Sequence, residues 1–247
     1  MNKKILIALG LVVSLMMVVP VFATTTRFTG LTYAHLVTTQ AQASALPADI
    51  DALGYDIGVL VDGDDLIITG IEVHDATKFG IAVDGRSGVD VMMCSIYNIG
   101  THVGSNFVPN GVQQGVGIYY WESSGVISGN DVSNYQKGGI VANYPRDDET
   151  VYVLDNTVTG LGPVDFIAQN GIQIGMEAKS VVRGNTVSGN YYIDVVVSGN
   201  GKALGQQAWV SCGILMYGVN PSETKVAQNK LFDNQVQFYM LPAKSIA

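Results

Sequence analysis

Two acidic residues have a spacing that could serve catalysis. Asp62 and Asp84 lie 22 residues apart, and each follows a glycine-aliphatic pair by the same number of positions. Two carboxylates held close together can share a proton, as general acid–base catalysis requires, or hold a cation. Asp62 and Asp84 are therefore the catalytic candidates. The alternative is that they are ordinary acidic residues of turns exposed to solvent.

The turn after the first of these positions contains further carboxylates. Asp62-Gly63-Asp64-Asp65 places three acidic side chains within four residues. Oxygen ligands of this kind suit Ca²⁺, so Asp62, Asp64 and Asp65 are candidate metal ligands, although the spacing is not that of an EF-hand loop. An exposed acidic turn without a metal is the simpler interpretation, and the sequence indicates no other cofactor.

A run of aromatic residues indicates ligand binding. Tyr119, Tyr120 and Trp121 are consecutive, and Tyr217 lies at a comparable place later in the chain. An aromatic ring stacks on the apolar face of a sugar while its polar tip stays hydrated. The alternative is that these rings pack beneath loops.

The histidines are isolated in the sequence. His35, His74 and His102 lie far apart, and a catalytic or metal-binding role would require a cluster. The sequence therefore leaves open whether the protein is an enzyme, and it favours a function without catalysis.

Repeats along the chain must position these residues. The closest glycine spacings, from Gly58 to Gly80 and from Gly117 to Gly139, are both 22 residues. A period near 22 with insertions at one point is typical of a solenoid. Six segments begin with glycine and an aliphatic residue and continue as a predicted strand: 58–61, 80–83, 117–120, 139–142, 171–174 and 213–216.

A second repeated motif has the form Asn-x-aliphatic. Equivalent residues of stacked coils lie about 4.8 Å apart, so these asparagines can form a ladder of hydrogen-bonded amides. Short alternating strands without helical periodicity then predict an all-β fold, a β-solenoid with three strands in each coil. The motif begins at Asn130, Asn156, Asn185 and Asn229, with degenerate copies at Thr69-Gly70-Ile71 and Cys94-Ser95-Ile96.

Strand alternation predicts which side chains face outward. If Ile81 and Val83 point into the core, Ala82 and Asp84 point out. The candidate ligand-binding residues on this face are Tyr119, Trp121, Asn143, Gln173 and Tyr217. The same alternation of inward and outward side chains gives two outward ladders. The first contains Leu60, Ala82, Tyr119, Val141, Gln173 and Leu215, and the second contains Asp62, Asp84, Trp121, Asn143, Gly175 and Tyr217.

The repeats resemble a known family. The Gly-Ile-x-Val and Asn-x-Val patterns, together with residues 135–141, 160–163 and 167–172, resemble the pectin-lyase-like superfamily over about residues 55–240. In particular, they look like a group of secreted bacterial and archaeal β-helix proteins. The resemblance implies a single-stranded right-handed parallel β-helix of about seven coils. In the family's enzymes the outer face of the first strands forms the substrate groove, so the resemblance implies that the same face binds a ligand in this chain. It implies no particular reaction, because this fold has many functions.

Catalytic motifs of the family's enzymes are missing from the sequence. It contains no Gly-His-Gly or Arg-Ile-Lys, as in polygalacturonases, and no Asp-Pro-His, as in alginate epimerases. If the protein is an enzyme, the resemblance implies a polysaccharide lyase or a glycoside hydrolase. A lyase needs a base, and nothing pairs Lys137, Arg146 or Arg183 with Asp62 and Asp84.

The chain divides into four predicted segments. Residues 1–23 are expected to be a signal peptide, 24–56 an N-terminal cap, 57–240 the β-helix and 241–247 a C-terminal tail. Three insertions, at about residues 100–116, 160–170 and 190–212, leave the coils at the same turn. They are expected to project from one side, which is the usual layout of a binding face.

The first segment predicts secretion. A short basic start with Lys3 and Lys4 precedes an apolar run from residue 5 to residue 19, and small residues end at Ala23. Its removal takes away two lysines and no acid, which moves the net charge from −8 to −10. An acidic surface disfavours nucleic acid as a partner, and no membrane insertion of the mature chain is expected. Periplasm and exterior remain equally open.

The two cysteines are predicted to be free thiols. Cys94 takes the place of an asparagine in the second triplet, and Cys212 precedes the glycine of the sixth repeat. Four coils at about 4.8 Å each separate them by at least about 19 Å. A disulfide needs Cα atoms within about 7 Å.

Two functions remain open at this level. The first is a secreted β-helix that binds, or processes, a polysaccharide across its first-strand face. The alternative is a surface or structural protein in which the solenoid is a rigid spacer or adhesin. A periplasmic role in metal maturation shares the repeat type but lacks a cluster of histidine and methionine. The sequence does not determine the glycan or the oligomeric state.

Overall fold

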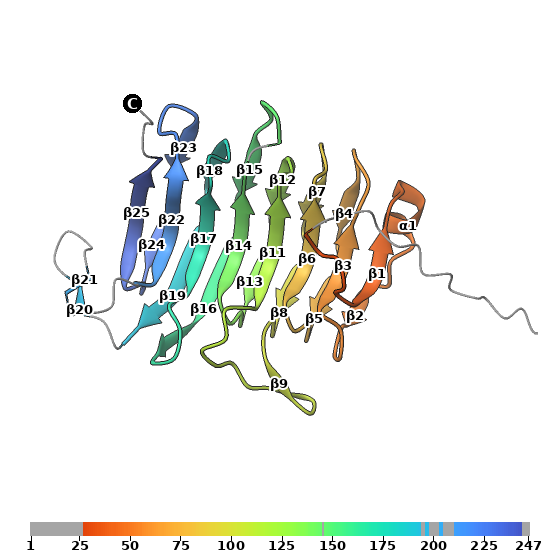
Figure 1. Ribbon diagram of the computed structural model, residues 1–247, viewed down its shortest axis with the longest axis horizontal. Helices are drawn as coiled ribbons and strands as arrows, with labels where there is room; N and C mark the ends of the chain where they lie inside the picture. Colours follow the sequence, from red (N-terminus) through yellow and green to blue (C-terminus); the bar gives the residue numbers. More distant parts are fainter. Residues whose placement is uncertain (1–26, 145, 194–195, 198–202, 205–209, 244–247) are drawn as a thin grey trace, which may run out of the picture.

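The computed structural model describes residues 27–144, 146–193, 196–197, 203–204 and 210–243, which form a parallel β-helix of about seven coils. Each complete coil contributes one strand to each of three parallel sheets, in the order first, second, third. Figure 1 shows the strands of the first sheet side by side, from β1 on the right to β25 on the left. The all-β fold and the coil number predicted from the repeats are confirmed.

The described strands pair in register within each sheet. The first sheet contains β1 (Tyr33–Val37), β3 (Ile57–Val61), β6 (Phe79–Asp84), β11 (Val116–Trp121), β14 (Gly138–Asn143), β17 (Asn170–Gly175), β22 (Cys212–Val219) and β25 (Val236–Pro242). The second sheet contains β4 (Ile67–Thr69), β7 (Asp90–Met92), β12 (Gly125–Ser128), β15 (Val151–Leu154), β18 (Ser180–Arg183) and β23 (Thr224–Ala227). The third sheet contains β2 (Asp49–Asp51), β5 (Glu72–His74), β8 (Ser95–Tyr97), β13 (Asp131–Ser133), β16 (Thr157–Val164), β19 (Thr186–Tyr192) and β24 (Lys230–Phe232).

The repeated glycine of each first-sheet strand makes room for the core. A Cβ atom at Gly139 would lie 2.4 Å from Cγ1 of Val158 and 2.6 Å from the carbonyl oxygen of Gly171. The valine belongs to the third sheet and points inward, so a larger residue at the glycine would clash with it. Close approach of two sheets therefore explains why the motif begins with glycine.

A ladder of asparagine amides runs through the turn before the third sheet. Asn156 Oδ1 accepts hydrogen bonds from the backbone N–H and the Nδ2 of Asn130, both at 2.9 Å. Its own Nδ2 donates to the carbonyl of Ile127 and to Oδ1 of Asn185, again at 2.9 Å. Asn185 and Asn229 repeat the pattern one coil further on. The predicted amide ladder is thus present, and it satisfies buried backbone groups that the turns leave unpaired.

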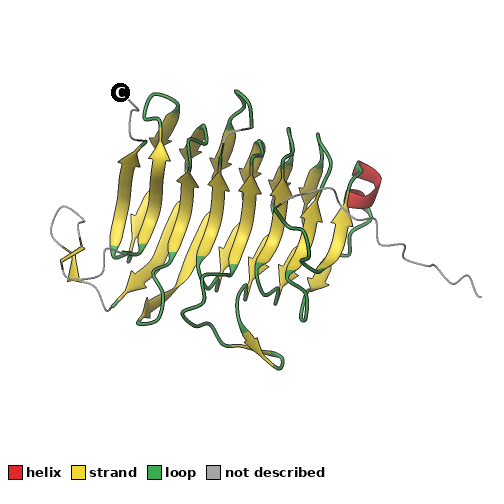
Figure 2. Ribbon diagram, in the orientation of Figure 1, coloured by secondary structure: helices red, strands yellow, loops and turns green. Residues whose placement is uncertain are grey.

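A short helix closes the first end of the solenoid. Helix α1 (Gln40–Ser44) lies between β1 and β2, where later coils have a second-sheet strand (Figure 2). Gln40 substitutes for that strand, because its side chain accepts from the N–H of Ile67 at 2.8 Å and donates to the same residue's carbonyl at 3.1 Å. No helix in the described part of the chain is long and apolar enough to cross a membrane.

The insertions leave the coils between the third and first sheets, on one side, as predicted. One carries the hairpin of β9 (His102–Val103) and β10 (Asn106–Phe107), and another the hairpin of β20 (Val196–Val197) and β21 (Ala203–Leu204). The buried Gln136 holds the first insertion to the coils. Its Oε1 accepts from the N–H groups of Thr101 and Asn110, and its Nε2 donates to the carbonyl of Val112 at 2.6 Å.

Both cysteines are free and buried, as predicted. Cys94 lies in the asparagine ladder, where its N–H donates to Oδ1 of Asn130 at 3.0 Å. Cys212 pairs with Asn170 in the first sheet. Burial raises the pKa of both thiols, to about 12 for Cys212, so both stay protonated near neutral pH.

Replacing Asn156 with alanine should destabilise the fold. The change leaves the Asn130 N–H and the Ile127 carbonyl buried without these partners, at about 1–3 kcal/mol for each group. We expect the free energy of unfolding in urea to fall by at least about 2 kcal/mol. The matched control is Asn106→Ala in the exposed hairpin strand β10, which should change it little. Equal effects of the two variants would contradict a stabilising role for the ladder.

Candidate functional site

The outer face of the first sheet carries the two predicted ladders in register. Strand pairing aligns Leu60, Ala82, Tyr119, Val141, Gln173 and Leu215 in one ladder, and Asp84, Trp121, Asn143, Gly175 and Tyr217 in the other. Asp62 follows the last residue of β3, so the pairing of the second ladder begins at Asp84. The face predicted from alternation therefore exists as a row of side chains across successive coils.

Residues that precede β1 cover the first half of this face. The ring of Phe28 lies 5.3 Å from that of Phe79 and 6.0 Å from that of Tyr119, and both contacts are edge-on. Tyr119 also stacks on Phe79 at 4.9 Å, and only 4% of Tyr119 is exposed. Together with Leu60 these residues belong to an apolar cluster separate from the main core. We call residues 27–31 the covering segment.

Burial changes what can be expected of Tyr119. Its side chain faces outward, as the alternation predicted, but the covering segment separates it from solvent. Its role in ligand binding stays a prediction, and that role would require the covering segment to move away. Part of the chain expected to cap the solenoid end thus lies along its side.

Asp56 fastens Thr32, the residue directly after the covering segment, to the coils. Its carboxylate accepts from the N–H of Thr32 at 3.0 Å and from the Thr32 hydroxyl at 3.2 Å, and it forms an ion pair with Lys78 at 3.1 Å. Burial raises the pKa of Asp56, but the hydrogen bonds from Thr32 and Lys78 outweigh burial and lower it overall. The carboxylate is therefore held in its charged form.

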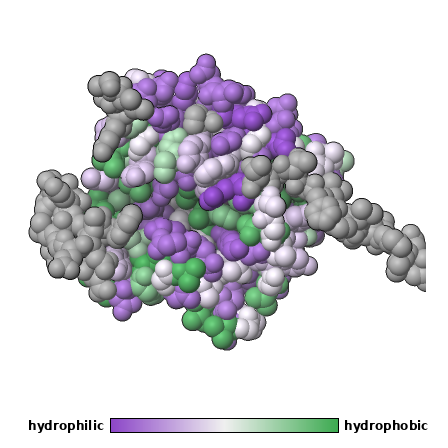
Figure 3. Space-filling model, viewed as in Figure 1, coloured by the Kyte–Doolittle hydropathy of each residue, from purple (hydrophilic) through white to green (hydrophobic). Residues whose placement is uncertain are grey.

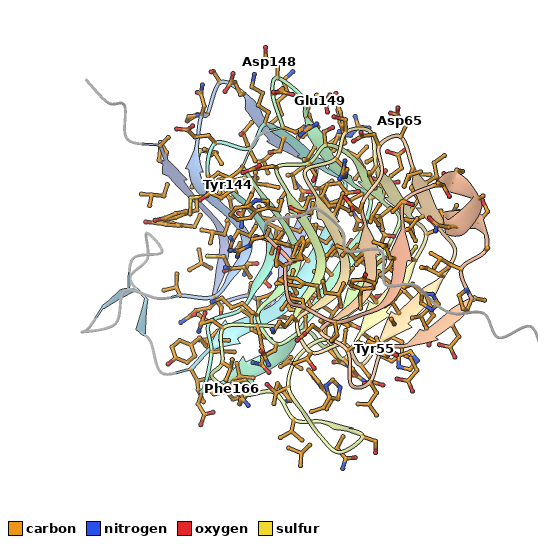
Figure 4. The ribbon with its side chains drawn as sticks, turned by 45° about the vertical axis from the view of Figure 1, so that its right-hand side comes forward. Tyr55, Asp65, Tyr144, Asp148, Glu149 and Phe166 are labelled. Carbon is orange, nitrogen blue, oxygen red and sulfur yellow. The ribbon has the colours of Figure 1, made fainter. Side chains whose placement is uncertain are left out.

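Tyr144 and Tyr217 are accessible beyond the covering segment, and Trp121, at the edge of that segment, is partly covered by Arg27. Trp121 is half-buried, with the Arg27 guanidinium 4.4 Å from its ring centroid and the Tyr144 ring 4.4 Å away at 60°. Tyr144 and Tyr217 are 37% and 44% exposed. Figure 4 shows Tyr144 below the loop that carries Asp148 and Glu149. Trp121 and Tyr217 thus lie on the first and last of four successive strands, β11, β14, β17 and β22, and Tyr144 directly follows β14.

Hydrogen-bonded amides occupy the space between these rings. Asn170 Nδ2 donates to Gln173 Oε1 at 3.0 Å, and Gln173 Nε2 donates to Asn143 Oδ1 at 3.4 Å. Gly175, between Asn143 and Tyr217 in the ladder, has no side chain to fill its place, and a Cβ there would lie 2.5 Å from Asn143 Oδ1. Asn170 is buried, whereas the amides of Asn143 and Gln173 are half-buried and leave polar groups partly accessible beside the aromatic rings.

The acidic candidates are engaged within the protein. Asp62 forms an ion pair with Arg86, and Asp84 is only 6% exposed. Asp64 Oδ1 accepts from the N–H of Ser87 at 2.8 Å, and Asp65 adopts a positive φ of 54° in the turn. In the part of the chain that the structure describes, the groups of three or more converging metal ligands do not include these four acids. Their catalytic and Ca²⁺-binding roles stay predictions.

Figure 3 shows how hydrophilic and apolar residues are distributed on this side of the molecule. Hydrophilic residues gather along the upper edge, where turns connect the first and second sheets, and apolar and hydrophilic patches are mixed below it. The candidate ligand-binding face is therefore amphipathic.

Sequence reasoning missed a second group of titratable residues, whose side chains the fold brings together. His74 Nδ1 lies 2.7 Å from Asp75 Oδ2, and His74 Nε2 lies 3.0 Å from Asp49 Oδ1. The other carboxylate oxygen of Asp75 is 3.0 Å from Nε2 of His102. The expectation that the histidines are isolated is therefore wrong for two of the three. We call Asp49, Glu72, His74, Asp75 and His102 the acid–histidine cluster.

Two structural features assemble this cluster. Asp49 pairs with Glu72, and Asp51 with His74, in neighbouring strands of the third sheet. His102 comes from the first insertion, which Gln136 holds through the N–H of Thr101. The 23-residue spacing from Asp49 to Glu72 is close to one repeat and was a usable signal in the sequence, whereas the position of His102 depends on a loop.

Contacts within the cluster change its proton affinities. Burial lowers the pKa of His74, but hydrogen bonds to Asp75 and Asp49 outweigh burial and raise it overall. For Asp75 burial raises the pKa, and hydrogen bonds from His74 and His102 more than reverse this. A hydrogen bond to Glu72 raises the pKa of Tyr97 to about 12. Tyr97 therefore stays protonated, and its hydroxyl donates a hydrogen bond to the carboxylate of Glu72.

The fold agrees with a comparison of the sequence with family models. The model described as "Right handed beta helix region" matches residues 50–231, well over half of the chain. The chain belongs to the right-handed β-helix family. The hand of the coil, which the resemblance implied, is shown by this match. No curated protein matches the sequence.

Three solved chains show similarity to this right-handed β-helix protein. The Dettilon tailspike protein (gp208) is 16% identical over 72% of this chain, with a TM-score of 0.39, and this chain spans 34% of the tailspike. Two structures of QnrB1, a plasmid-mediated fluoroquinolone resistance protein, are each 10% identical, with TM-scores of 0.18 and 0.14. They cover 81% and 80% of this chain, which spans 91% of each.

The Asp56 contacts predict a pH-dependent stability difference. A carboxyl with a lowered pKa stabilises the fold above its unfolded-state pKa, near 3.8, and loses this contribution as the pH falls through its folded-state pKa. Asp56→Asn should therefore lower the free energy of unfolding at pH 7, and the difference from wild type should be smaller at pH 3, below the unfolded-state pKa. Urea unfolding at both pH values measures it.

The matched control for this experiment is Asp233→Asn. Asp233 is exposed and has a positive φ of 52°, which asparagine also tolerates. Its replacement should leave the unfolding free energy nearly unchanged at both pH values. A difference between wild type and Asp56→Asn that is as large at pH 3 as at pH 7 would contradict the assignment.

Proposed function

We propose that the protein binds a neutral polysaccharide across the open part of the first sheet, from Trp121 to Tyr217. The observation that carries the proposal is the combination of exposed rings at Tyr144 and Tyr217 and a half-buried ring at Trp121 with hydrogen-bonded amides between them. Sugars present both an apolar ring face and hydroxyl groups. Aromatic side chains complement the first, and amides, which both donate and accept, complement the second.

The geometry of the solenoid suits a chain-like ligand. Trp121 and Tyr217 lie three coils apart in one ladder, which corresponds to roughly 14 Å at about 4.8 Å a coil. The backbone hydrogen bonds of a parallel sheet fix this separation. Once Arg27 leaves the Trp121 ring, the rings can therefore stack on different units of one extended chain without rearrangement of the coils, which lowers the entropic cost of binding.

Charge favours a neutral ligand over an acidic one. The chain has 21 acidic and 13 basic residues, for a net charge of −8. Arg27 is close to the open face but lies over the Trp121 ring, and Lys137 is directed to the carbonyl of Ala168 at 2.8 Å. A polyanion would be repelled by the net negative charge of the protein, and both Arg27 and Lys137 already contact other groups of the chain.

Binding without catalysis fits the acidic residues best. Hydrolysis of a glycosidic bond commonly uses two carboxyl groups at a defined separation that are free to exchange protons. Asp62 is paired with Arg86, and Asp84 is buried. The proposal is therefore a binding protein, placed outside the cytoplasm if residues 1–23 act as the signal peptide that the sequence predicts.

Loss of either outer ring should weaken polysaccharide binding. We expect Trp121→Ala and Tyr217→Ala each to raise the dissociation constant about tenfold, since stacking contributes roughly 0.5–1.5 kcal/mol beyond buried area. The measurement is affinity electrophoresis or calorimetry against a panel of neutral and acidic polysaccharides.

The matched control is Tyr152→Ala, which removes a similarly exposed tyrosine from β15 of the second sheet. Its affinity should equal that of wild type. If a bound polysaccharide tolerates both outer-ring variants while they stay folded, this face is not the binding site. If no polysaccharide binds, the rigid-spacer alternative takes its place.

A further inference from the structure

The acid–histidine cluster lies away from the proposed glycan face, on the third sheet. Asp49 and Glu72 are aligned in neighbouring strands, and His74 follows Glu72 by two residues, so all three side chains leave the same outer face. One ligand atom from each lies within 4.8 Å of the others. Three donors thus converge on one point from strands that the sheet holds rigid.

Each nitrogen of His74 faces a carboxylate. Nδ1 lies 2.7 Å from Asp75, and Nε2 lies 3.0 Å from Asp49. Both contacts are favourable only if both nitrogens carry hydrogen or if a cation takes the place of one hydrogen. Nε2 is the nitrogen that shares its neighbourhood with Asp49 and Glu72, so a metal ion there would displace the Nε2 proton to solvent.

Asp75 orients His74 in the way that outer-shell carboxylates orient metal-binding histidines. It accepts from Nδ1, which leaves Nε2 available as the metal ligand. Asp75 is held in turn by His102, whose Nε2 is 3.0 Å from its second oxygen and whose Nδ1 is 3.0 Å from the carbonyl of Gly100. The first insertion therefore supports the ligand set from outside.

Tyr97 completes the support of the ligands. Its hydroxyl lies 2.5 Å from Oε1 of Glu72, and its ring stacks on that of His74 at 5.0 Å with an angle of 11° between the planes. The contact holds one glutamate oxygen and leaves the other available. Glu72 and His74 are half-buried and Asp49 is exposed, so an ion can reach all three.

The charge around the cluster favours a cation. Asp49, Asp51, Glu72 and Asp75 contribute four carboxylates within two coils. Among the described residues, none of these four forms an ion pair with lysine or arginine. Two histidines balance at most half of this negative charge, and a divalent ion would balance the rest.

We propose that Asp49, Glu72 and His74 bind a divalent transition-metal ion, with Asp75 and His102 as positioning residues. One imidazole nitrogen with two carboxylates suits Zn²⁺ or Mn²⁺, whereas Ca²⁺ takes oxygen ligands only. Three protein ligands leave at least one coordination position for water. The site lies on a different sheet from the proposed glycan face and does not depend on it.

Calorimetry on the full chain, stripped with EDTA, tests the proposal. ZnCl₂ should bind with one ion per chain, and CaCl₂ at the same concentrations should bind at least about 100-fold more weakly. Bound Zn²⁺ should also raise the melting temperature, because it binds the folded state. Glu72→Gln and His74→Gln should each weaken Zn²⁺ binding more than about 100-fold. This loss exceeds the one expected when a residue that only supports a metal ligand is replaced.

Further variants separate ligands from positioning residues. Asp75→Asn should weaken Zn²⁺ binding about 10–100-fold, and Asp75→Glu should recover part of it. Asp131→Asn is the matched control, because Asp131 lies in the same outward ladder as Glu72 but two coils away, roughly 10 Å. His35→Gln, which changes the third histidine, should also bind as wild type does.

Three results would overturn the proposal. The first is no Zn²⁺ binding by the folded wild-type chain at 100-fold molar excess. The second is Zn²⁺ binding that Glu72→Gln and His74→Gln leave intact while circular dichroism shows both variants folded. The third is loss of binding in His35→Gln or Asp131→Asn equal to that in the ligand variants, which would place the ion elsewhere. If the ligand variants fail to fold, Asp75→Asn tests the proposal instead, and unchanged Zn²⁺ binding by this variant in its folded form would overturn it.

Discussion

Hydrogen bonding between neighbouring coils is the constraint on which the rest of the structure depends. Every coil must present its N–H and C=O groups at the spacing of the next, about 4.8 Å, in three sheets at once. A buried backbone group left unpaired costs about 1–3 kcal/mol, so turns as well as strands must continue the pattern. The asparagine ladder meets this requirement where the strands stop, and Gln40 meets it where the first coil lacks a strand.

The same constraint converts sequence spacing into distance. Residues one repeat apart become direct neighbours, so any side chain that suits a function lies beside its counterparts in a row. The open face between Trp121 and Tyr217 and the cluster around His74 are both built in this way. They differ in chemistry because one row offers rings and amides, and the other offers carboxylates and imidazole. Two kinds of ligand can therefore be held by one scaffold on different sheets.

Segments outside the coils modify these rows. The covering segment places Phe28 over Tyr119, which turns a row of outward side chains into a second apolar cluster and leaves only the later coils accessible. The first insertion brings His102 to Asp75 and completes a chain of contacts that ends at Asp49. In both cases a side chain of the coils holds the segment in place. Asp56 accepts from the N–H and the hydroxyl of Thr32, directly after the covering segment, and Gln136 accepts from N–H groups of the first insertion.

The sequence by itself determined the coiled all-β architecture, the register of the outward ladders and the free state of the two cysteines. These follow from local alternation and from a repeat length, and the uniform coil spacing then fixes every neighbour. Only the tertiary structure decided which outward residues are accessible and which distant residues meet. Phe28 reaches Tyr119, and His102 reaches Asp75, through segments that have no counterpart in the repeat. Their positions depend on packing and hydrogen bonds with particular side chains, which no periodicity encodes.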